Sequence, residues 1–228
     1  MLFRSQVVET FEERVFRRFL PQGLPVPTDF QKLSADQQNV WTLIEQSLDS
    51  KEYKAFLLHG VTGSGKTEVY LHAVRKCLEL EKTALVLVPE ISLTPQLVNR
   101  FRERFGDLVA VLHSGMDDGE RFDEWSRIQL GQAKIAIGAR SAIFAPLMNL
   151  GLVVIDEEHD QSYKQDEGII YNARDMAISR GSFENIPVNL ITAVPSIETY
   201  ENIKKKNIKY QSFNKDTKID RKSTRLNS

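Results

Sequence analysis

The stretch Gly60-Val-Thr-Gly-Ser-Gly-Lys-Thr67 constrains this chain more than any other part of its sequence. It matches the pattern G-x-x-x-x-G-K-[ST], in which backbone N–H groups of a loop and of a helix N-terminus bind a phosphate. An apolar run at 55–59 precedes the stretch and a helical pattern follows it, as such a loop requires. The sequence therefore predicts an ATP-binding loop that consists of Gly60, Val61, Thr62, Gly63, Ser64, Gly65, Lys66 and Thr67.

Four side chains are candidates for the chemistry of a bound nucleotide. In the loop, Lys66 offers a positive charge to the β- and γ-phosphates, and the Thr67 hydroxyl offers a ligand to Mg²⁺. A second polar cluster, Asp156-Glu-Glu-His159, ends the apolar run 151–156. We expect Asp156 to contact Mg²⁺ directly or through water, and Glu157 to orient and deprotonate the attacking water.

The alternation of apolar runs with helical patterns indicates the fold. A helical pattern covers roughly 36–49, and continuous apolar runs, typical of parallel strands that are covered on both faces, follow it with helices between them. These runs lie at 55–59, 83–88, 108–112, 134–138, 151–156 and 188–192. The order predicts an α/β fold with a doubly wound parallel sheet and helices on both faces, which binds ligands at the carboxyl ends of its strands.

Composition narrows the class of protein. The single cysteine, Cys77, excludes a disulfide framework and a cysteine-only zinc site. No apolar run approaches the roughly 18 residues of a membrane span, so we expect a cytoplasmic protein without membrane contact. Residues 204–228 carry nine Lys or Arg against two Asp, whereas the rest of the chain carries 21 basic and 29 acidic residues. A nucleic-acid site would therefore be a local patch.

Three segments differ in character. Residues 1–28 end in a proline-rich stretch and are predicted to form an extension or linker. Residues 29–203 contain the strand and helix patterns and are predicted to form the nucleotide-binding domain. Residues 204–228 offer little apolar surface to bury, so we expect a disordered basic tail.

Several further stretches carry a resemblance. Together with the two clusters above, "VPEISLTPQ" (88–96), "LHSG" (112–115), "IGARSAIFAP" (137–146) and "IDEEHDQSYKQDEGIIYNARDMA" (155–177) resemble superfamily 2 helicases of the DEAD/DEAH type, and among them the PriA family of replication-restart helicases. The resemblance runs from about residue 30 to residue 210. It implies a RecA-like P-loop NTPase lobe that uses ATP and Mg²⁺.

The resemblance also implies a function and partners. They are ATP-dependent, 3′–5′ DNA unwinding in replication restart and primosome assembly, on single-stranded and forked DNA, with primosome and single-strand-binding proteins as partners. The second lobe, its arginine finger and the zinc-binding cysteines of the family are missing from the sequence, so we expect the first lobe of a larger enzyme, nearly inactive alone. Two alternatives stay open: another superfamily 2 translocase or RNA helicase, and a non-catalytic nucleotide-binding module.

Carried over residue by residue, the resemblance assigns further roles. Gln37 would read adenine, although Ser34 and Gln37 also form a capping-box pattern. Thr94 would contact a DNA phosphate, although it is also a plausible helix cap. Arg140 and Ser141, in the loop after a strand, would contact DNA, although a lone arginine in a loop is usually solvated.

The segment after the acidic cluster resembles the aromatic-rich loop of the family. Tyr163 and Tyr171 would stack on bases, and Lys164 and Arg174 would attract a single strand. The alternative is that Tyr171 packs in the core.

The resemblance assigns His159 to coupling between ATP state and DNA contacts, and the alternative is an ion-paired surface histidine. Where the family has Ser-Ala-Thr-Pro-Ser, this chain has Thr192-Ala-Val194-Pro-Ser. The missing hydroxyl at Val194 places one coupling contact in doubt, and Thr192 is the candidate to replace it.

Overall fold

A computed structural model describes residues 30–50, 52–205 and 207–212 of the chain. Its α-helices are α1 (Ala35–Ser50), α2 (Lys66–Glu79), α3 (Pro95–Phe105), α4 (Asp118–Gln129), α5 (Ala173–Phe183) and α6 (Ile197–Lys204). Its strands are β1 (Ala55–His59), β2 (Thr83–Leu87), β3 (Val109–Leu112), β4 (Ile135–Gly138), β5 (Leu150–Ile155), β6 (Lys164–Gln165), β7 (Tyr171–Asn172), β8 (Val188–Thr192) and β9 (Ile208–Ser212). The predicted extension 1–28 lies outside the described residues. In the described part, no helix is long and apolar enough to span a membrane.

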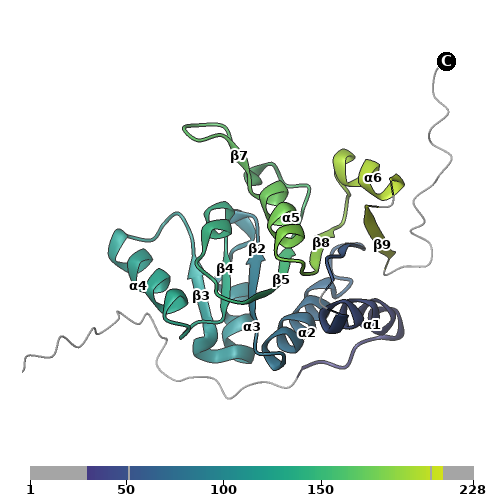
Figure 1. Cartoon of the computed structure of the whole chain (residues 1–228), viewed down its shortest axis with the longest axis horizontal. Coiled ribbons are helices and arrows are strands. Elements are labelled where there is room, and N and C mark those ends of the chain that lie inside the picture. Colours follow the sequence, from purple (N-terminus) through teal and green to yellow (C-terminus); the bar gives the residue numbers. More distant parts are fainter. Residues whose placement is uncertain (1–29, 51, 206, 213–228) are drawn as a thin grey trace, which may run out of the picture.

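A seven-stranded sheet with strand order β3-β4-β2-β5-β8-β1-β9 organises the molecule (Figure 1). Every neighbouring pair in this sheet is parallel. The predicted doubly wound parallel sheet is therefore confirmed. Because the strands share one direction, the loops that follow β1 and β5 open at the same edge of the sheet, where open α/β sheets bind their ligands.

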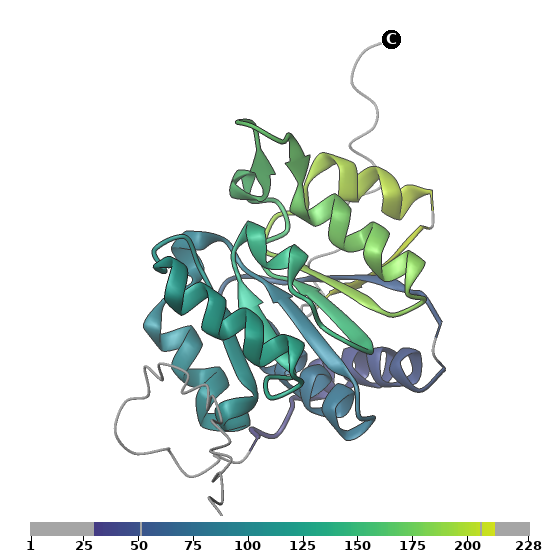
Figure 2. The same ribbon diagram turned by 60° about the vertical axis from the view of Figure 1, so that its left-hand side comes forward.

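Helices cover both faces of the sheet. Successive residues of a strand point to opposite faces, so each strand contributes side chains to two cores. Phe56 and Leu58 of β1 pack in a core with α1, α2 and α3. Ala55 and Leu57 of the same strand belong to a second core, which includes residues of α4 and α5. Figures 1 and 2 show α1 and α2 on one side of the sheet and α5 on the other. Two apolar faces explain why the strand sequences are continuously apolar.

A short antiparallel hairpin, β6–β7, follows the acidic cluster after β5. Lys164 pairs with Asn172 and Gln165 with Tyr171, and Gly168 at the turn has a φ of 69°. Figure 1 shows the hairpin extending beyond the body of the molecule, next to the start of α5. Its position at the carboxyl edge of the sheet places it beside the loops that carry the other predicted site residues.

The C-terminal boundary predicted from the sequence is wrong. Residues 208–212, placed in a disordered tail, form β9 and pair with β1 from Ala55↔Ile208 to His59↔Ser212. Tyr210 also fixes this strand, because its hydroxyl lies 2.8 Å from Nδ1 of His59. The domain therefore includes residues up to 212 rather than ending at 203. Residues 213–228 lie outside the described residues.

Candidate functional site

The predicted phosphate-binding loop connects β1 to α2 at the carboxyl edge of the sheet. Gly63 and Gly65 have φ values of 82° and 79°, in the left-handed region that favours glycine. Gly65 also directly precedes Lys66, the first residue of α2. A Cβ atom on Gly65 would lie 2.2 Å from Nε2 of Gln37, the end of a flexible side chain, so it is the backbone conformation that favours glycine here. The loop backbone is thus shaped to approach a phosphate closely.

Lys66 is buried and its ammonium group lies among loop carbonyls. Its Nζ donates hydrogen bonds to the carbonyl oxygens of Gly60 at 2.7 Å and Val61 at 2.9 Å. Burial lowers the pKa of Lys66, and the negative charges of Glu157 and Asp156 oppose this shift. The lysine of the loop and the two acidic residues after β5 therefore act on one another electrostatically.

Asp156 directly follows β5, and its backbone N–H donates to the carbonyl of Leu87 at 2.8 Å. The hydroxyl of Tyr70 donates to its Oδ2 at 3.3 Å. Burial, followed by the charge of Glu157, raises the pKa of Asp156 to about 6. Tyr70 stands in α2, as Thr67 does, so this bond connects Asp156 to the helix that follows the phosphate loop.

Glu157 adopts an unusual backbone conformation, with a φ of 44°. Its N–H donates to Oδ1 of Asp156 at 3.0 Å, and its carbonyl accepts from the N–H of Asp160 at 2.9 Å. A non-glycine residue in the left-handed region is strained and persists only where its surroundings hold it. The tight turn thus fixes the backbone of the predicted base directly after β5.

His159 contacts the strand that carries the altered motif. Its Nδ1 lies 2.8 Å from Oγ1 of Thr192. The Thr192 hydroxyl donates to the carbonyl of Val194 at 2.8 Å, so the bond to His159 uses a proton on Nδ1. Glu157 Oε2 lies 3.6 Å from the same nitrogen. Thr192 therefore provides a hydroxyl contact to the acidic cluster even though residue 194 is valine.

Gln37 forms the capping box that its spacing predicts. Its Oε1 accepts from the N–H of Ser34 at 2.9 Å, and its own N–H donates to Oγ of Ser34 at 3.3 Å. Its Nε2 donates to the carbonyl of Ser64 at 3.1 Å. The side chain thus supports the phosphate-binding loop, while its contact with adenine stays a prediction.

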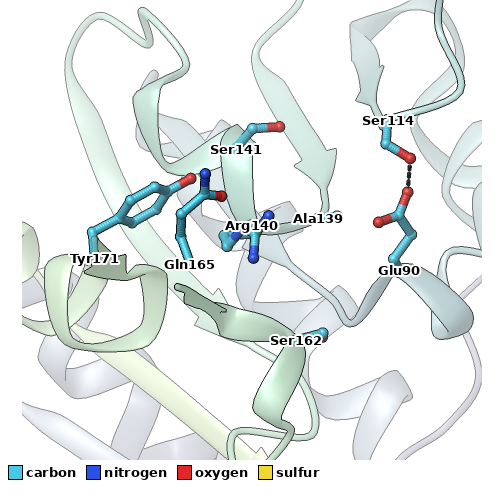
Figure 3. A pocket seen from close by; sticks show the side chains of 8 residues that line it. All are labelled: Glu90, Ser114, Ala139, Arg140, Ser141, Ser162, Gln165 and Tyr171. Atoms are coloured by element: carbon cyan, nitrogen blue, oxygen red, sulfur yellow. Dashed lines mark hydrogen bonds between the residues drawn. The ribbon is translucent and has the colours of Figure 1, made fainter. Parts of the chain in front are cut away.

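A cavity of about 200 Å³ lies at the ends of β2, β3 and β4, and no residue of the phosphate loop lines it (Figure 3). The predicted DNA contacts Arg140 and Ser141 line it, and Arg140 donates to the carbonyl of Lys164. On its far side the hydroxyl of Ser114 donates to Glu90. Its full lining is Glu90, Ser114, Ala139, Arg140, Ser141, Ser162, Gln165 and Tyr171.

The remaining predicted DNA contacts differ in accessibility. Lys164 is exposed in the hairpin. Thr94 is half-buried and caps α3 by accepting a hydrogen bond from the N–H of Leu97 at 3.3 Å. This contact agrees with the alternative interpretation of Thr94 as a helix cap. A phosphate contact from Thr94 stays a prediction.

Two of the predicted DNA contacts are corrected by the structure. Tyr163 is 1% exposed and packs in the core, so its ring offers no face to a base. Arg174 is 8% exposed, and its guanidinium is paired with Glu158 and Asp175. Tyr171, by contrast, is half-buried and lines the cavity, where its ring packs edge-on against Phe144 at 5.3 Å. The aromatic residue next to a nucleic-acid strand would be Tyr171.

Comparison with known proteins agrees with this arrangement. Residues 34–203 match the family described as DEAD/DEAH box helicase. The chain belongs to the DEAD/DEAH box helicase family. Members of this family use ATP and a divalent metal in general, which agrees with the loop and the acidic cluster. Among the described residues, no group of three or more His, Cys, Asp or Glu side chains is placed to hold a metal ion by itself.

Comparison with individual relatives is more specific than the match to the family. This helicase-family chain is 50% identical over 205 residues to the Replication restart protein PriA of Bacillus subtilis, with 90% of the chain and 25% of that protein covered. It is 53% identical over 152 residues to the Replication restart protein PriA of Synechocystis, with 66% of the chain and 18% of that protein covered. The chain thus spans about a quarter or less of the length of these relatives.

Solved structures agree on the fold. The helicase domain of Pyrococcus furiosus Hef superposes with a TM-score of 0.54 at 21% identity, covering 78% of this chain and 38% of that one. RecG bound to a three-way DNA junction superposes with a TM-score of 0.59 at 21% identity, covering 85% of this chain and 27% of that one. At this level of identity the likeness shows a shared helicase-type α/β fold.

Proposed function

We propose that this chain is the nucleotide-binding lobe of an ATP-dependent DNA helicase that acts in replication restart. The observation that carries the proposal is the convergence of Lys66, Thr67, Asp156 and Glu157 at one edge of the sheet. Tyr70 of α2 hydrogen-bonds to Asp156 there, and the charges of Glu157 and Asp156 act on Lys66. The similarity to proteins named Replication restart protein PriA supports the choice among helicases.

The residues present fit a nucleotide with Mg²⁺. The loop from Gly60 to Gly65 presents backbone N–H groups, and Lys66 adds a positive charge for the β- and γ-phosphates. A hydroxyl from Thr67 and a carboxylate from Asp156 are oxygen ligands of the kind that Mg²⁺ prefers. When bound, the metal neutralises charge on the phosphates. Gln37, beside the loop, contacts adenine in this proposal.

Glu157 and His159 have separate roles in this mechanism. Glu157 orients the attacking water and accepts its proton, which its fixed position after β5 favours. His159 links the acidic cluster to Thr192 and so connects the nucleotide site to the loop after β8. The second lobe of the complete enzyme would supply the arginine finger that this mechanism requires.

The cavity beside hairpin β6–β7 is the proposed contact for single-stranded DNA. Thr94, Arg140, Ser141 and Lys164 would contact the sugar–phosphate backbone, and Tyr171 would stack on a base. The chain has a formal net charge of −1, so this local surface, rather than the charge of the whole molecule, would attract DNA.

In the complete protein we infer 3′–5′ unwinding of forked DNA during primosome assembly in the cytoplasm. Primosome and single-strand-binding proteins are its inferred partners. The names of the relatives support replication restart, and the polarity, the substrate and the partners follow the resemblance of the sequence motifs.

A measurement of ATP turnover tests the proposal in a protein that joins this chain to its second lobe. Forked DNA should stimulate turnover more than blunt duplex or RNA does. Glu157→Gln should preserve Mg-ATP binding and lower turnover by roughly 10²–10⁴-fold, the range that general base catalysis supplies. Glu79→Gln, a change at an exposed position at the end of α2, is the control and should keep the parent rate. Equal stimulation by RNA would favour an RNA helicase, and turnover without any nucleic-acid response would refute the proposal.

A further inference from the structure

Glu158 is a buried carboxylate between two residues of the proposed mechanism, and that mechanism assigns it no role. It follows Glu157 and precedes His159, and its side chain is 0% exposed. Glutamate is rarely buried this completely without partners, because desolvation of a charge is costly. The contacts of Glu158 therefore indicate what it holds in place.

One set of contacts reaches the start of α6. Oε1 accepts from the backbone N–H of Ser196 at 2.8 Å. Oε2 accepts from the hydroxyls of Ser196 at 3.0 Å and Thr199 at 2.8 Å. Ser196 is itself the N-cap of α6, and a negative charge at a helix N-terminus is favourable. Glu158 thus fixes the loop that follows β8 to the acidic cluster.

A second contact reaches the hairpin. Nη1 of Arg174 lies 3.5 Å from Oε2 of Glu158 and donates to Oγ of Ser196 at 3.0 Å. Arg174 stands in the first turn of α5, directly after β7. Asn172 of β7 caps that helix by accepting from the N–H of Arg174 at 3.0 Å. One buried ion pair therefore connects the acidic cluster to the strand that carries Tyr171.

The backbone of Glu158 completes the link to the nucleotide site. Its N–H donates to the carbonyl of Ile191, in β8, at 2.9 Å. The preceding residue, Glu157, has the strained φ of 44°. Because Glu158 is held by both its backbone and its side chain, it limits how Glu157 relaxes or moves.

We propose that Glu158 is a positioning residue that couples the nucleotide site to hairpin β6–β7. The inference rests on the proposed function, because it assumes that a nucleotide binds beside Asp156 and Glu157. When nucleotide binding shifts the turn 156–159, the Glu158 carboxylate moves Arg174, and with it β7 and Tyr171. The same connection works in reverse, since coupling between two sites is reciprocal.

Hydrogen exchange of the 228-residue chain with and without Mg-ADP tests the proposal. In the parent, Mg-ADP should change exchange in the hairpin peptide 164–172 by roughly fivefold or more, the lower end of typical couplings. In Glu158→Gln the same peptide should no longer respond, while the Mg-ADP Kd stays within about threefold of the parent value. Arg174→Gln removes the hairpin side of the connection without changing Glu158 and should also abolish the response, which keeps the test available if the first variant folds poorly.

Asp175→Asn is the matched control. Asp175 pairs with the same arginine, at 2.9 Å from its Nε, but its side chain is 59% exposed. This variant should respond to Mg-ADP as the parent does. A hairpin response in Glu158→Gln equal to that of the parent would overturn the proposal, as would no response in the parent, or equal losses in Asp175→Asn and Glu158→Gln. A purely structural role would instead raise exchange throughout the chain and leave the response to Mg-ADP intact. If the parent does not bind Mg-ADP at all, the proposed function itself fails, and the coupling with it.

Discussion

The phenolic oxygen of Tyr163 lies 2.5 Å from the backbone carbonyl oxygen of Asp156, to which it donates a hydrogen bond. The ring is 1% exposed and packs in the core that α4 and α5 share with the sheet. Tyr163 therefore supports the end of β5 at Asp156, the residue proposed to contact Mg²⁺.

We predict that Tyr163→Ala lowers the free energy of unfolding by about 3–5 kcal/mol, as loss of a large buried ring does. Tyr163→Phe keeps the ring, removes only the hydrogen bond, and should cost about 1 kcal/mol. Denaturant titration of both variants gives these values.

The affinity of Tyr163→Phe for single-stranded DNA should equal that of the parent. Tyr171→Ala should weaken that affinity, since stacking on an aromatic ring contributes roughly 1–3 kcal/mol per base. The opposite ranking would restore Tyr163 as the stacking residue.

Lys66→Ala should weaken Mg-ADP binding by at least about tenfold, because hydrogen bonds to charged groups contribute roughly 1.5–3 kcal/mol. The loop N–H groups remain in this variant, so residual binding is expected. Calorimetry on the 228-residue chain measures the effect. Lys134→Ala, which removes the lysine directly before β4, is the control and should bind as the parent does. Unchanged affinity in Lys66→Ala would exclude this loop as the phosphate site.

The acidic residue after β5 should make the stability of the nucleotide-free protein depend on pH. The pKa of Asp156 rises from 3.8 to about 6, mainly through burial. A carboxyl group with a raised pKa in the folded state opposes folding when it ionises, so the penalty is absent below about pH 4, grows towards pH 6 and is complete above it. Asp156→Asn should therefore raise the free energy of unfolding by about 1–3 kcal/mol at pH 7 in EDTA. This gain should vanish near pH 4, and a gain that persists there would show that ionisation is not its cause.

The sheet could be predicted because each buried strand appears in the sequence as a short, continuous apolar run. The boundaries of β1 at 55–59 and β8 at 188–192 agree with the predicted runs, since both strands are buried on both faces. β9, with the sequence Ile-Lys-Tyr-Gln-Ser, was missed because it is an edge strand with only Ile208 buried. A short, mostly polar segment forms a strand only when a neighbouring strand provides backbone hydrogen-bonding partners.

The candidate site also has residues that could be predicted from the sequence and residues that could not. The phosphate loop and the acidic cluster are short contiguous motifs whose chemistry depends on spacing, so their residues could be named in advance. The assignments of Tyr163 and Arg174 failed because burial depends on partners that are distant in sequence. Arg174 is paired with Glu158, sixteen positions away, and residue type alone does not distinguish a buried arginine from one that faces DNA.

A polar side chain inside the sheet offers a test of core energetics. Asn189 of β8 is 0% exposed, and neither Oδ1 nor Nδ2 has a hydrogen-bond partner among the described residues. It pairs with Phe56 and Val154, whose side chains belong to the core beneath α1 and α2. An unpartnered buried amide costs roughly 1–3 kcal/mol, so Asn189→Leu, which is similar in size, should raise the free energy of unfolding by about that amount. Asn189→Asp, the matched control, should lower it, and a lower melting temperature in Asn189→Leu would show that the amide is satisfied by a partner.

The 228-residue chain should bind ATP but hydrolyse it very slowly, with or without single-stranded DNA. Lys66, Thr67, Asp156 and Glu157 can hold phosphate, metal and water, but charge on the transferred phosphoryl group requires a further cation. Arginine fingers contribute roughly 10³–10⁵-fold to turnover. Arg140 donates to Lys164 at the cavity, and Arg174 pairs with Glu158, so neither is placed to serve the phosphate loop. Steady-state turnover of the chain, compared with that of a protein that adds the second lobe, measures the difference. Robust DNA-stimulated turnover by the chain alone would mean that a cation within these 228 residues completes the site, and the requirement for a second lobe would have to be abandoned.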